Sequence, residues 1–226
     1  MKAMTLKRAK QLTGHKSGLG KPSKMPGYST ALPADQCITG SKLRKKAGTI
    51  CEKCYAMKGN YQFPSVRKGL INRLRCLDTD LVPRDLWIDA MVLLIGHYTD
   101  PEDPYFRIHD SGDFQSIEHI MRWVEIARRL SWVQFWAPTK EYAMLRRVIN
   151  MLDALGEDWP ANFIVRLSAP MRGAQAPKRW RADGSLFSTV DAGTGRRCPA
   201  PKQDNACVDC RSCWNPSIQA IDYHAH

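Results

Sequence analysis

The chain has 226 residues, 43% of them apolar, and a net charge of +12. A single domain of this size can bury a substantial core. The longest apolar run, residues 90–96, is far shorter than the roughly 20 residues of a membrane-spanning helix. The first residues also lack the apolar stretch and cleavage site of a signal peptide. We therefore expect no membrane partner and a soluble protein of the cytoplasm.

The positive charge is concentrated at the start of the chain. Residues 1–24 contain seven lysines and arginines and no acidic residue, so they account for seven of the twelve excess charges. Their low apolar content predicts a basic, mobile arm, followed by a single α/β domain over residues 25–226. Lysines neutralise phosphates without reading sequence, so nucleic acid is one partner for this arm. A solubilising tail is the alternative.

Strand and helix patterns alternate after the arm. We expect, in chain order, a strand over residues 28–32, helices over 66–77 and 83–94, a strand over 105–109, a helix over 116–130, a strand over 133–137, a helix over 139–155, and strands over 162–167 and 186–190. Ser116 and Thr139 are the expected N-caps of the last two helices, and Gly156 ends the second of them. Cys76 lies in the first helix, where burial is expected.

The order of these elements predicts a parallel sheet, because successive βα units place their strands side by side in one direction. A closed barrel of eight units needs about 250 residues, and this chain has room for four to six units. We therefore expect an incomplete (β/α) barrel or an open parallel sheet, with cysteine-rich loops near both ends of the chain. Such folds place their functional sites at the carboxyl ends of the strands.

Polar residues follow several of the predicted strands. The candidate catalytic residues are His109, Asp110, Ser111 and Asp113 after the second strand, Lys140 after the third and Arg166 at the end of the fourth. A histidine with acidic neighbours can act as a general base, and a serine can act as a nucleophile or substrate contact. Lys140 and Arg166 can bind an anionic substrate, or they can simply be solvated. If the strand extends to these residues, strand alternation predicts that His109 and Ser111 share one face and that Asp110 lies on the other.

Seven of the eight cysteines lie in two spaced groups. The N-terminal group is Cys37, Cys51 and Cys54, and the C-terminal group is Cys198, Cys207, Cys210 and Cys213. Both groups contain C-x2-C, a spacing that brings two thiolates onto one metal ion or cluster. A reducing cytoplasm disfavours disulfides, so this pattern predicts metal binding.

The two groups differ in what they can hold. Three thiolates on a [4Fe-4S] cluster leave one iron open to a substrate, so the N-terminal group predicts a reactive cluster. The C-x2-C-x2-C run of the C-terminal group is ferredoxin-like and predicts a second, fully ligated cluster, with Cys198 as the fourth ligand. A structural four-cysteine zinc site is the alternative there. The spacing also allows the two groups to share ligands on one cluster.

Several motifs resemble the phage gene-product-eighty-eight family. They are Cys37-x-Thr-Gly-Ser-Lys-Leu, Gly48-x-Ile-Cys51-x-x-Cys54-Tyr-Ala, Arg107-x-His-x-Ser-Gly-Asp-Phe114, Thr139-Lys140 and the C-terminal Cys-Trp block. The resemblance extends over residues 16–216 and implies a phage protein of the host cytoplasm. The family's name implies no activity.

A more distant resemblance concerns layout. A cysteine loop after the first strand of a partial barrel is similar to radical S-adenosylmethionine enzymes. This similarity implies that S-adenosylmethionine binds the open iron and that Asp113 holds its amino group. Thirteen residues separate Cys37 from Cys51, however, so only the C-x2-C part matches the compact motif of those enzymes.

Three functions are consistent with the sequence. The first is an iron-sulfur enzyme that performs radical or redox chemistry on an unidentified small molecule. The second is a hydrolase that uses His109, Asp110, Ser111 and Asp113, with a structural or Lewis-acid cluster. The third is a zinc-stabilised protein that binds nucleic acid through the basic arm.

Overall fold

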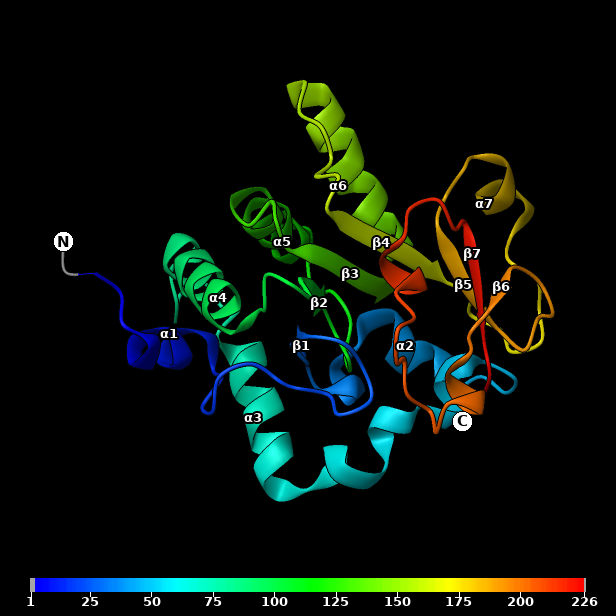
Figure 1. The fold of residues 1–226 in the computed structure, drawn as a ribbon, viewed down its shortest axis with the longest axis horizontal. Helices are drawn as coiled ribbons and strands as arrows, with labels where there is room; N and C mark the ends of the chain where they lie inside the picture. Colours follow the sequence, from blue (N-terminus) through cyan, green and yellow to red (C-terminus); the bar gives the residue numbers. More distant parts are fainter. Residues whose placement is uncertain (1–2, 226) are drawn as a thin grey trace.

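The computed structural model describes residues 3–225 and contains a seven-stranded sheet (Figure 1). The strands are β1 (Tyr28–Ser29), β2 (Tyr105–Arg107), β3 (Gln134–Thr139), β4 (Phe163–Ser168), β5 (Phe187–Val190), β6 (Arg196–Arg197) and β7 (Ala220–Tyr223). Their order in the sheet is β1-β2-β3-β4-β5-β7-β6, and each pairing is parallel. Because β1 and β6 lie at opposite edges, the sheet is open. The predicted open parallel sheet is therefore confirmed, and the barrel alternative is not adopted.

Helices interleave with the strands, and four of them, α3 to α6, lie where the sequence predicts helices. They are α1 (Leu6–Thr13), α2 (Ile38–Leu43), α3 (Pro64–Arg75), α4 (Arg84–Tyr98), α5 (Ile117–Arg129), α6 (Tyr142–Leu155) and α7 (Lys178–Ala182). Figure 1 shows α4, α5 and α6 as a row along the sheet. Each of these three helices connects two neighbouring strands, as the predicted βα units require.

The two faces of the sheet carry different side chains, because alternate residues of a strand point in opposite directions. Phe106, Phe135 and Phe163, on three adjacent strands, belong to the main core with apolar residues of α4, α5 and α6. Trp136 and Ile164 point to the other face, where they pack with Trp214 from the C-terminal loop. Helices thus cover one face, and an irregular loop covers part of the other.

The helix caps agree with the sequence in two of three places. Ser116 caps α5, since its hydroxyl accepts a hydrogen bond from the amide of residue 119 at 3.0 Å. Gly156 ends α6 with a φ of 68°. The prediction that Thr139 caps α6 is wrong: the helix begins after Glu141. The Thr139 hydroxyl instead donates to a carboxylate oxygen of Asp113.

The expected mobile arm contains a docked helix. In α1, Ala9 and Leu12 are buried in the main core, and the helix packs on α4. Residues 6–13 therefore belong to the folded domain, which differs from the arm predicted over residues 1–24. The apolar residues Leu6, Ala9 and Leu12 recur every three positions, and this narrow stripe suffices to bury one side of a lysine-rich helix.

Gly112 is where the loops that follow β1 and β2 meet. It has a φ of +87°, and a Cβ there would lie 2.6 Å from the Cβ of Leu32 and 2.9 Å from its carbonyl oxygen. The neighbouring Ser111 hydrogen-bonds Leu32 twice, through its carbonyl at 2.9 Å and its hydroxyl at 2.6 Å. The close approach therefore depends on glycine at this position.

We expect Gly112→Ala to lower the free energy of unfolding more than Gly184→Ala does. Both glycines have a positive φ, but a Cβ at Gly184 would meet no atom within 4 Å. The two variants share the backbone strain, whereas only Gly112→Ala adds overlap, which costs roughly 1 to 3 kcal/mol. Denaturant unfolding measures the difference. Equal losses would contradict tight packing against Leu32.

Candidate functional site

The N-terminal cysteine group is built around Gly40 in α2. Cys37 directly precedes α2, and Cys51 lies in a short 3-10 helix, Ile50–Lys53. A Cβ at Gly40 would lie 3.7 Å from the Cys37 sulfur, 3.6 Å from the Cys51 sulfur and 2.9 Å from the Cys37 Cβ. Two thiols that are far apart in sequence therefore lie against the same glycine, and a larger residue there would push into them.

Electrostatic interactions show which other groups lie near these thiols. Burial raises the pKa of Cys37 to about 12, and the charges of Asp113, Cys54 and Cys51 add to the increase. Burial also raises the pKa of Cys51, while the positive charge of Lys140 opposes the increase. The structure thus brings together the three predicted ligands and two of the predicted rim residues.

The cysteine loop is anchored to the ends of β3 and β4. The amide of Ile50 donates to the carbonyl of Pro170 at 2.9 Å, just beyond β4. At α2, the amide and hydroxyl of Thr39 donate to the two carboxylate oxygens of Glu141, at 2.8 and 2.9 Å. Glu141 lies between β3 and α6. These contacts fix the loop at the carboxyl edge of the sheet, where the sequence predicts the site.

Asp113 joins the loops that follow β2 and β3. Its carboxylate accepts hydrogen bonds from the Thr139 hydroxyl at 2.6 Å and from the amides of Phe114 and Lys140, each at 2.8 Å. Burial raises its pKa to about 6, and these hydrogen bonds oppose the increase. The carboxylate therefore holds the polar rim in shape beside the cysteines.

His109 lies apart from this rim. The strand β2 ends at Arg107, and His109 has a φ of 64°, so the expected alternation does not continue. Its ring is buried, with ring centroids 4.9 Å from Phe114 and 5.4 Å from His119. Neither ring nitrogen has a hydrogen-bond partner within residues 3–225. His109 thus faces the core on the α5 side.

Ser111 and Asp110, two other residues of the predicted hydrolase site, form hydrogen bonds away from His109. The Ser111 hydroxyl donates to the carbonyl of Leu32, and Asp110 accepts from the Ser29 hydroxyl at 3.0 Å. The prediction that His109 and Ser111 share a strand face does not hold, because the backbone turns at His109. The structure therefore does not bring these side chains together as a hydrogen-bonded nucleophile and base.

Three buried histidines hold neutral rings around a small cavity of about 10 Å³. They are His15, His109 and His119. Burial lowers the pKa of His15 and of His109 to about 3, and it lowers the pKa of His119 well below its ordinary value. In the unfolded chain each ring takes up a proton near pH 6.5. Their contribution to stability is therefore complete above pH 6.5 and is lost on acidification toward pH 3. The raised pKa of Asp113 has the opposite effect on stability. It stabilises the folded state at low pH, and this contribution is lost as the pH rises through about 6.

We expect His109→Phe to flatten the dependence of unfolding free energy on pH. One proton fewer is taken up on unfolding, so the slope between pH 4 and 6 should fall by about 1.4 kcal/mol per pH unit. Urea unfolding across this range measures it. His97→Phe is the control, because His97 is exposed on α4. Equal slopes in wild type and His109→Phe would contradict the buried neutral ring.

The C-terminal cysteines also form one group. Burial raises the pKa of Cys207, and the charges of Cys198 and Cys210 add to the increase. The Cys210 amide donates to the Cys207 carbonyl at 2.8 Å. The sulfur of Cys213 lies 3.0 Å from the Tyr223 hydroxyl. Burial raises the pKa of the Cys213 thiol to about 12. Four cysteines predicted to act together therefore lie near one another.

Arg166 holds the loop that carries the last of these cysteines. It is fully buried on β4, and its guanidinium donates to five main-chain carbonyls. They belong to Ser212, Cys213, Asn215, Ile218 and Gln219, at distances from 2.7 to 3.3 Å. The sequence suggested an anionic substrate for Arg166. The structure shows that its donors are engaged by the protein.

We expect Arg166→Met to lower the free energy of unfolding by roughly 3 kcal/mol or more, because several buried carbonyls lose their donor. Hydrogen exchange should accelerate over residues 212–219. Arg172→Met is the matched control, since Arg172 is half exposed and pairs with Asp191 alone at 3.1 Å. A loss no larger than that of the control would show that the loop holds its shape without Arg166.

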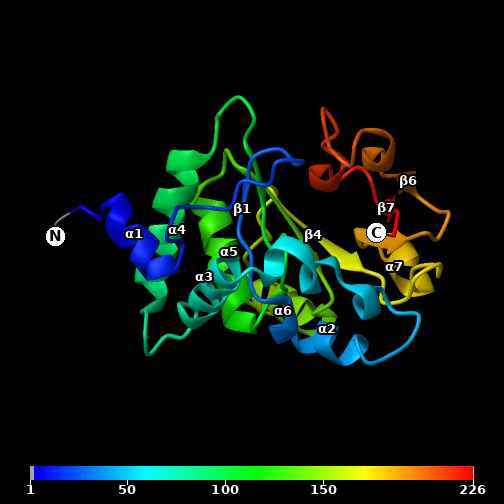
Figure 2. The ribbon, with the colours of Figure 1, turned by 90° about the horizontal axis from the view of Figure 1, so that it is seen from below.

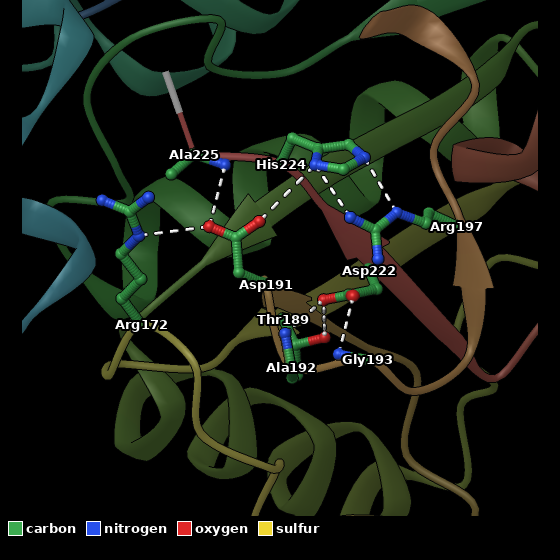
Figure 3. Close-up of polar contacts among 9 residues, drawn as sticks. All are labelled: Arg172, Thr189, Asp191, Ala192, Gly193, Arg197, Asp222, His224 and Ala225. Carbon is green, nitrogen blue, oxygen red and sulfur yellow. Dashed lines mark hydrogen bonds and ion pairs between the residues drawn. The ribbon is translucent and has the colours of Figure 1, made fainter. Parts of the chain in front are cut away.

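A second polar network fixes the chain beside Cys198 (Figure 3). Asp222, buried on β7, accepts hydrogen bonds from the Thr189 hydroxyl and from the amides of residues 192 and 193. Its carbonyl accepts from the Cys198 amide at 2.9 Å. Arg197 donates to the ring of His224 at 2.8 Å. The first cysteine of the C-terminal group is thus held by the edge of the sheet.

Arg107 lies between the two cysteine groups and was not foreseen as a site residue. Its guanidinium donates to the Tyr55 hydroxyl at 3.3 Å and stacks over the Trp136 ring at 4.8 Å. Tyr55 directly follows Cys54. The charge of Arg107 also opposes the increase in pKa of Cys213. The motif Arg107-x-His contains this residue, but only the fold shows that Arg107 interacts with residues of both cysteine groups.

These features define an α/β protein with an open parallel sheet and two cysteine groups. A family model described as gene product 88 matches residues 3–216, so the chain belongs to the phage gene product 88 family. Comparisons with curated proteins and with solved structures find no match. Within the described residues, none of the helices has the length and apolar character required to cross a bilayer.

Proposed function

We propose that this chain is an iron-sulfur enzyme, in which Cys37, Cys51 and Cys54 hold a [4Fe-4S] cluster. The observation that carries the proposal is that the sulfurs of Cys37 and Cys51 both lie beside Gly40, with Cys54 near enough to act electrostatically on both, in a loop anchored at the carboxyl edge of the sheet. Parallel α/β proteins bind ligands at this edge. The C-terminal cysteines would hold a second cluster with four protein ligands.

The spacing of the C-terminal cysteines favours a cluster over a single zinc ion in this proposal. Zinc bonds to sulfur are about 2.3 Å long, so four thiolates must crowd around one zinc ion. Across residues 3–225, no three cysteine, histidine or acidic side chains gather closely enough to ligate one ion. A cluster of four irons separates its ligands more widely. The close contact of Gly40 with Cys37 and Cys51 means that a side chain at this position would displace the thiols.

Three protein ligands leave one iron of a cubane open, and a bound cluster would supply redox or radical chemistry there. The chain's own residues shape the surroundings of that position. Lys140 provides a positive charge near Cys51 that can pair with an anionic substrate group. Asp113 keeps the backbone of Lys140 fixed through its amide. S-adenosylmethionine is the first ligand to test, because its carboxylate and amino group match this mixed-charge rim.

Arg107 is the residue of this chain that would stabilise negative charge at either group. A reduced cluster carries one more negative charge, and a nearby cation would stabilise that state. Arg107 acts electrostatically on Cys207 and Cys213 and is hydrogen-bonded to Tyr55, the neighbour of Cys54. A hydrolase is less consistent with the geometry, because Ser111 and His109 have separate environments.

Anaerobic purification followed by iron, sulfide and zinc analysis tests the proposal. Two clusters give about eight irons and eight sulfides per chain. The protein should also show a broad absorption band at about 400 nm that dithionite bleaches. Addition of S-adenosylmethionine should alter the electron paramagnetic resonance spectrum of the reduced protein if it binds the open iron. Zinc without iron would overturn the proposal and favour a zinc-stabilised binding protein.

We expect Cys51→Ser to remove about half of the iron and sulfide, because one of two clusters loses a ligand. Cys76→Ser is the matched control, since Cys76 lies outside both groups and ends α3. It should retain full iron content. Cys210→Ser should remove the other half. Unchanged iron in Cys51→Ser would show that the N-terminal group holds no cluster.

A further inference from the structure

A basic groove of about 570 Å³ lies between α1 and α3. The two helices are neighbours in both views of the fold (Figures 1 and 2). The charged residues of its lining are Lys7, Lys10, Lys16 and Arg75, and the amides of Gln11 and Asn72 lie among them. All of its lining residues belong to the part of the chain that the structure describes, and none of them is acidic. Neither cysteine group contributes to this groove.

The groove is rigidly built. Gly14, with a φ of +70°, ends α1 against the backbone of α3. A Cβ there would lie 2.7 Å from the amide nitrogen of Arg73 and 2.7 Å from the carbonyl carbon of Asn72. The docking of α1 on α4 holds the other side. The positions of the basic side chains along both helices are therefore set by close backbone packing.

The positive charges of the groove have no acidic partners. None of the four cations takes part in an ion pair within residues 3–225. Residues 1–34 and 53–77, which supply α1 and α3, contain no aspartate or glutamate. The next acidic residues, Asp78 and Asp80, do not line the groove. Lys10 also lies over the Tyr98 ring, 5.6 Å from its centroid. Four cations without acidic partners in one concave surface repel one another, and a bound polyanion would remove this repulsion.

We propose that this groove binds the phosphate backbone of duplex nucleic acid. Lysine and arginine neutralise phosphates, and side-chain amides such as those of Gln11 and Asn72 also donate to phosphate oxygens. The lining contains no aromatic ring on which an unpaired base could stack. Backbone contacts alone carry no sequence information. The groove therefore binds duplexes without sequence preference, and it does so independently of any cluster.

The salt dependence of binding provides a quantitative test. Fluorescence anisotropy would follow a labelled DNA duplex of about two helical turns, titrated with the full-length protein. Each phosphate contact contributes about 0.9 to the slope of log affinity against log salt, so four contacts give a slope of about −3.6. Affinity should then fall roughly 100-fold between about 50 and 200 mM salt.

The variant K7Q/K10Q/K16Q/R75Q should lose most of this slope. Its matched control, R146Q/R147Q/K178Q/R181Q, removes four exposed charges on α6 and α7 and should keep the wild-type slope. Circular dichroism confirms that both variants are folded. Equal weakening by both variants would overturn the proposal, because net charge alone would then explain binding. Binding of inorganic polyphosphate or of single strands in preference to the duplex would also overturn it.

Alkylation of Cys76 locates the bound duplex. Cys76 lines the groove, and iodoacetamide labelling can be assigned to it by mass spectrometry. The duplex should slow this labelling in wild type and in the control variant. An unchanged rate under saturating duplex would place the DNA elsewhere and overturn the proposal. The Cys51→Ser protein should bind duplex as wild type does, so failure of the cluster proposal and failure of this one are distinguishable.

Discussion

The requirement that a parallel sheet be covered on both faces shapes this molecule. The connecting helices α4, α5 and α6 cover one face, and the C-terminal loop covers part of the other with Trp214. A loop packed on a sheet has main-chain carbonyls without helical or strand partners, and these need donors when they are buried. Arg166 supplies donors to five of them from the sheet itself. The covering loop is also the loop that carries the C-terminal cysteines, so one interaction serves both the core and the site.

The parallel arrangement also explains why the two cysteine groups approach each other. The N-terminal group follows β1 at one edge of the sheet, and Cys198 follows β6 at the opposite edge. The loop from β6 to β7 returns across the sheet face and brings Cys213 near Arg107 on β2. Tyr55 reaches the same arginine from the N-terminal group. A single half-buried cation thus lies near residues of both cysteine groups.

The sequence predicted the elements with clear apolar periodicity, including the strands β2 to β5 and the helices α3 to α6. It missed β6 and β7, because Arg196–Arg197 has no apolar pattern and Asp222 interrupts the apolar residues of β7. It missed α1 because only three of its eight residues, Leu6, Ala9 and Leu12, are apolar. Its assignment of the cysteines to two ligand sets stays a prediction. It misplaced His109, since a positive φ in a non-glycine residue is decided by tertiary contacts that no local pattern records.

The fold brings together two segments of the chain that lack acidic residues. Residues 1–34 and 53–77 are both free of acidic residues, and the fold brings their helices together at Gly14. The cysteine loop lies between these two segments in the sequence, and α3 follows Cys54 after only a few short turns. A polyanion bound along α3 would therefore lie on the element that directly continues the cysteine loop. Two acidic residues, Asp35 and Glu52, separate the segments: Asp35 pairs with Arg67 at 2.9 Å, and Glu52 accepts a hydrogen bond from the Gly48 amide at 2.8 Å. Acidic side chains are retained where they order the loop, and they are absent where the two basic helices meet.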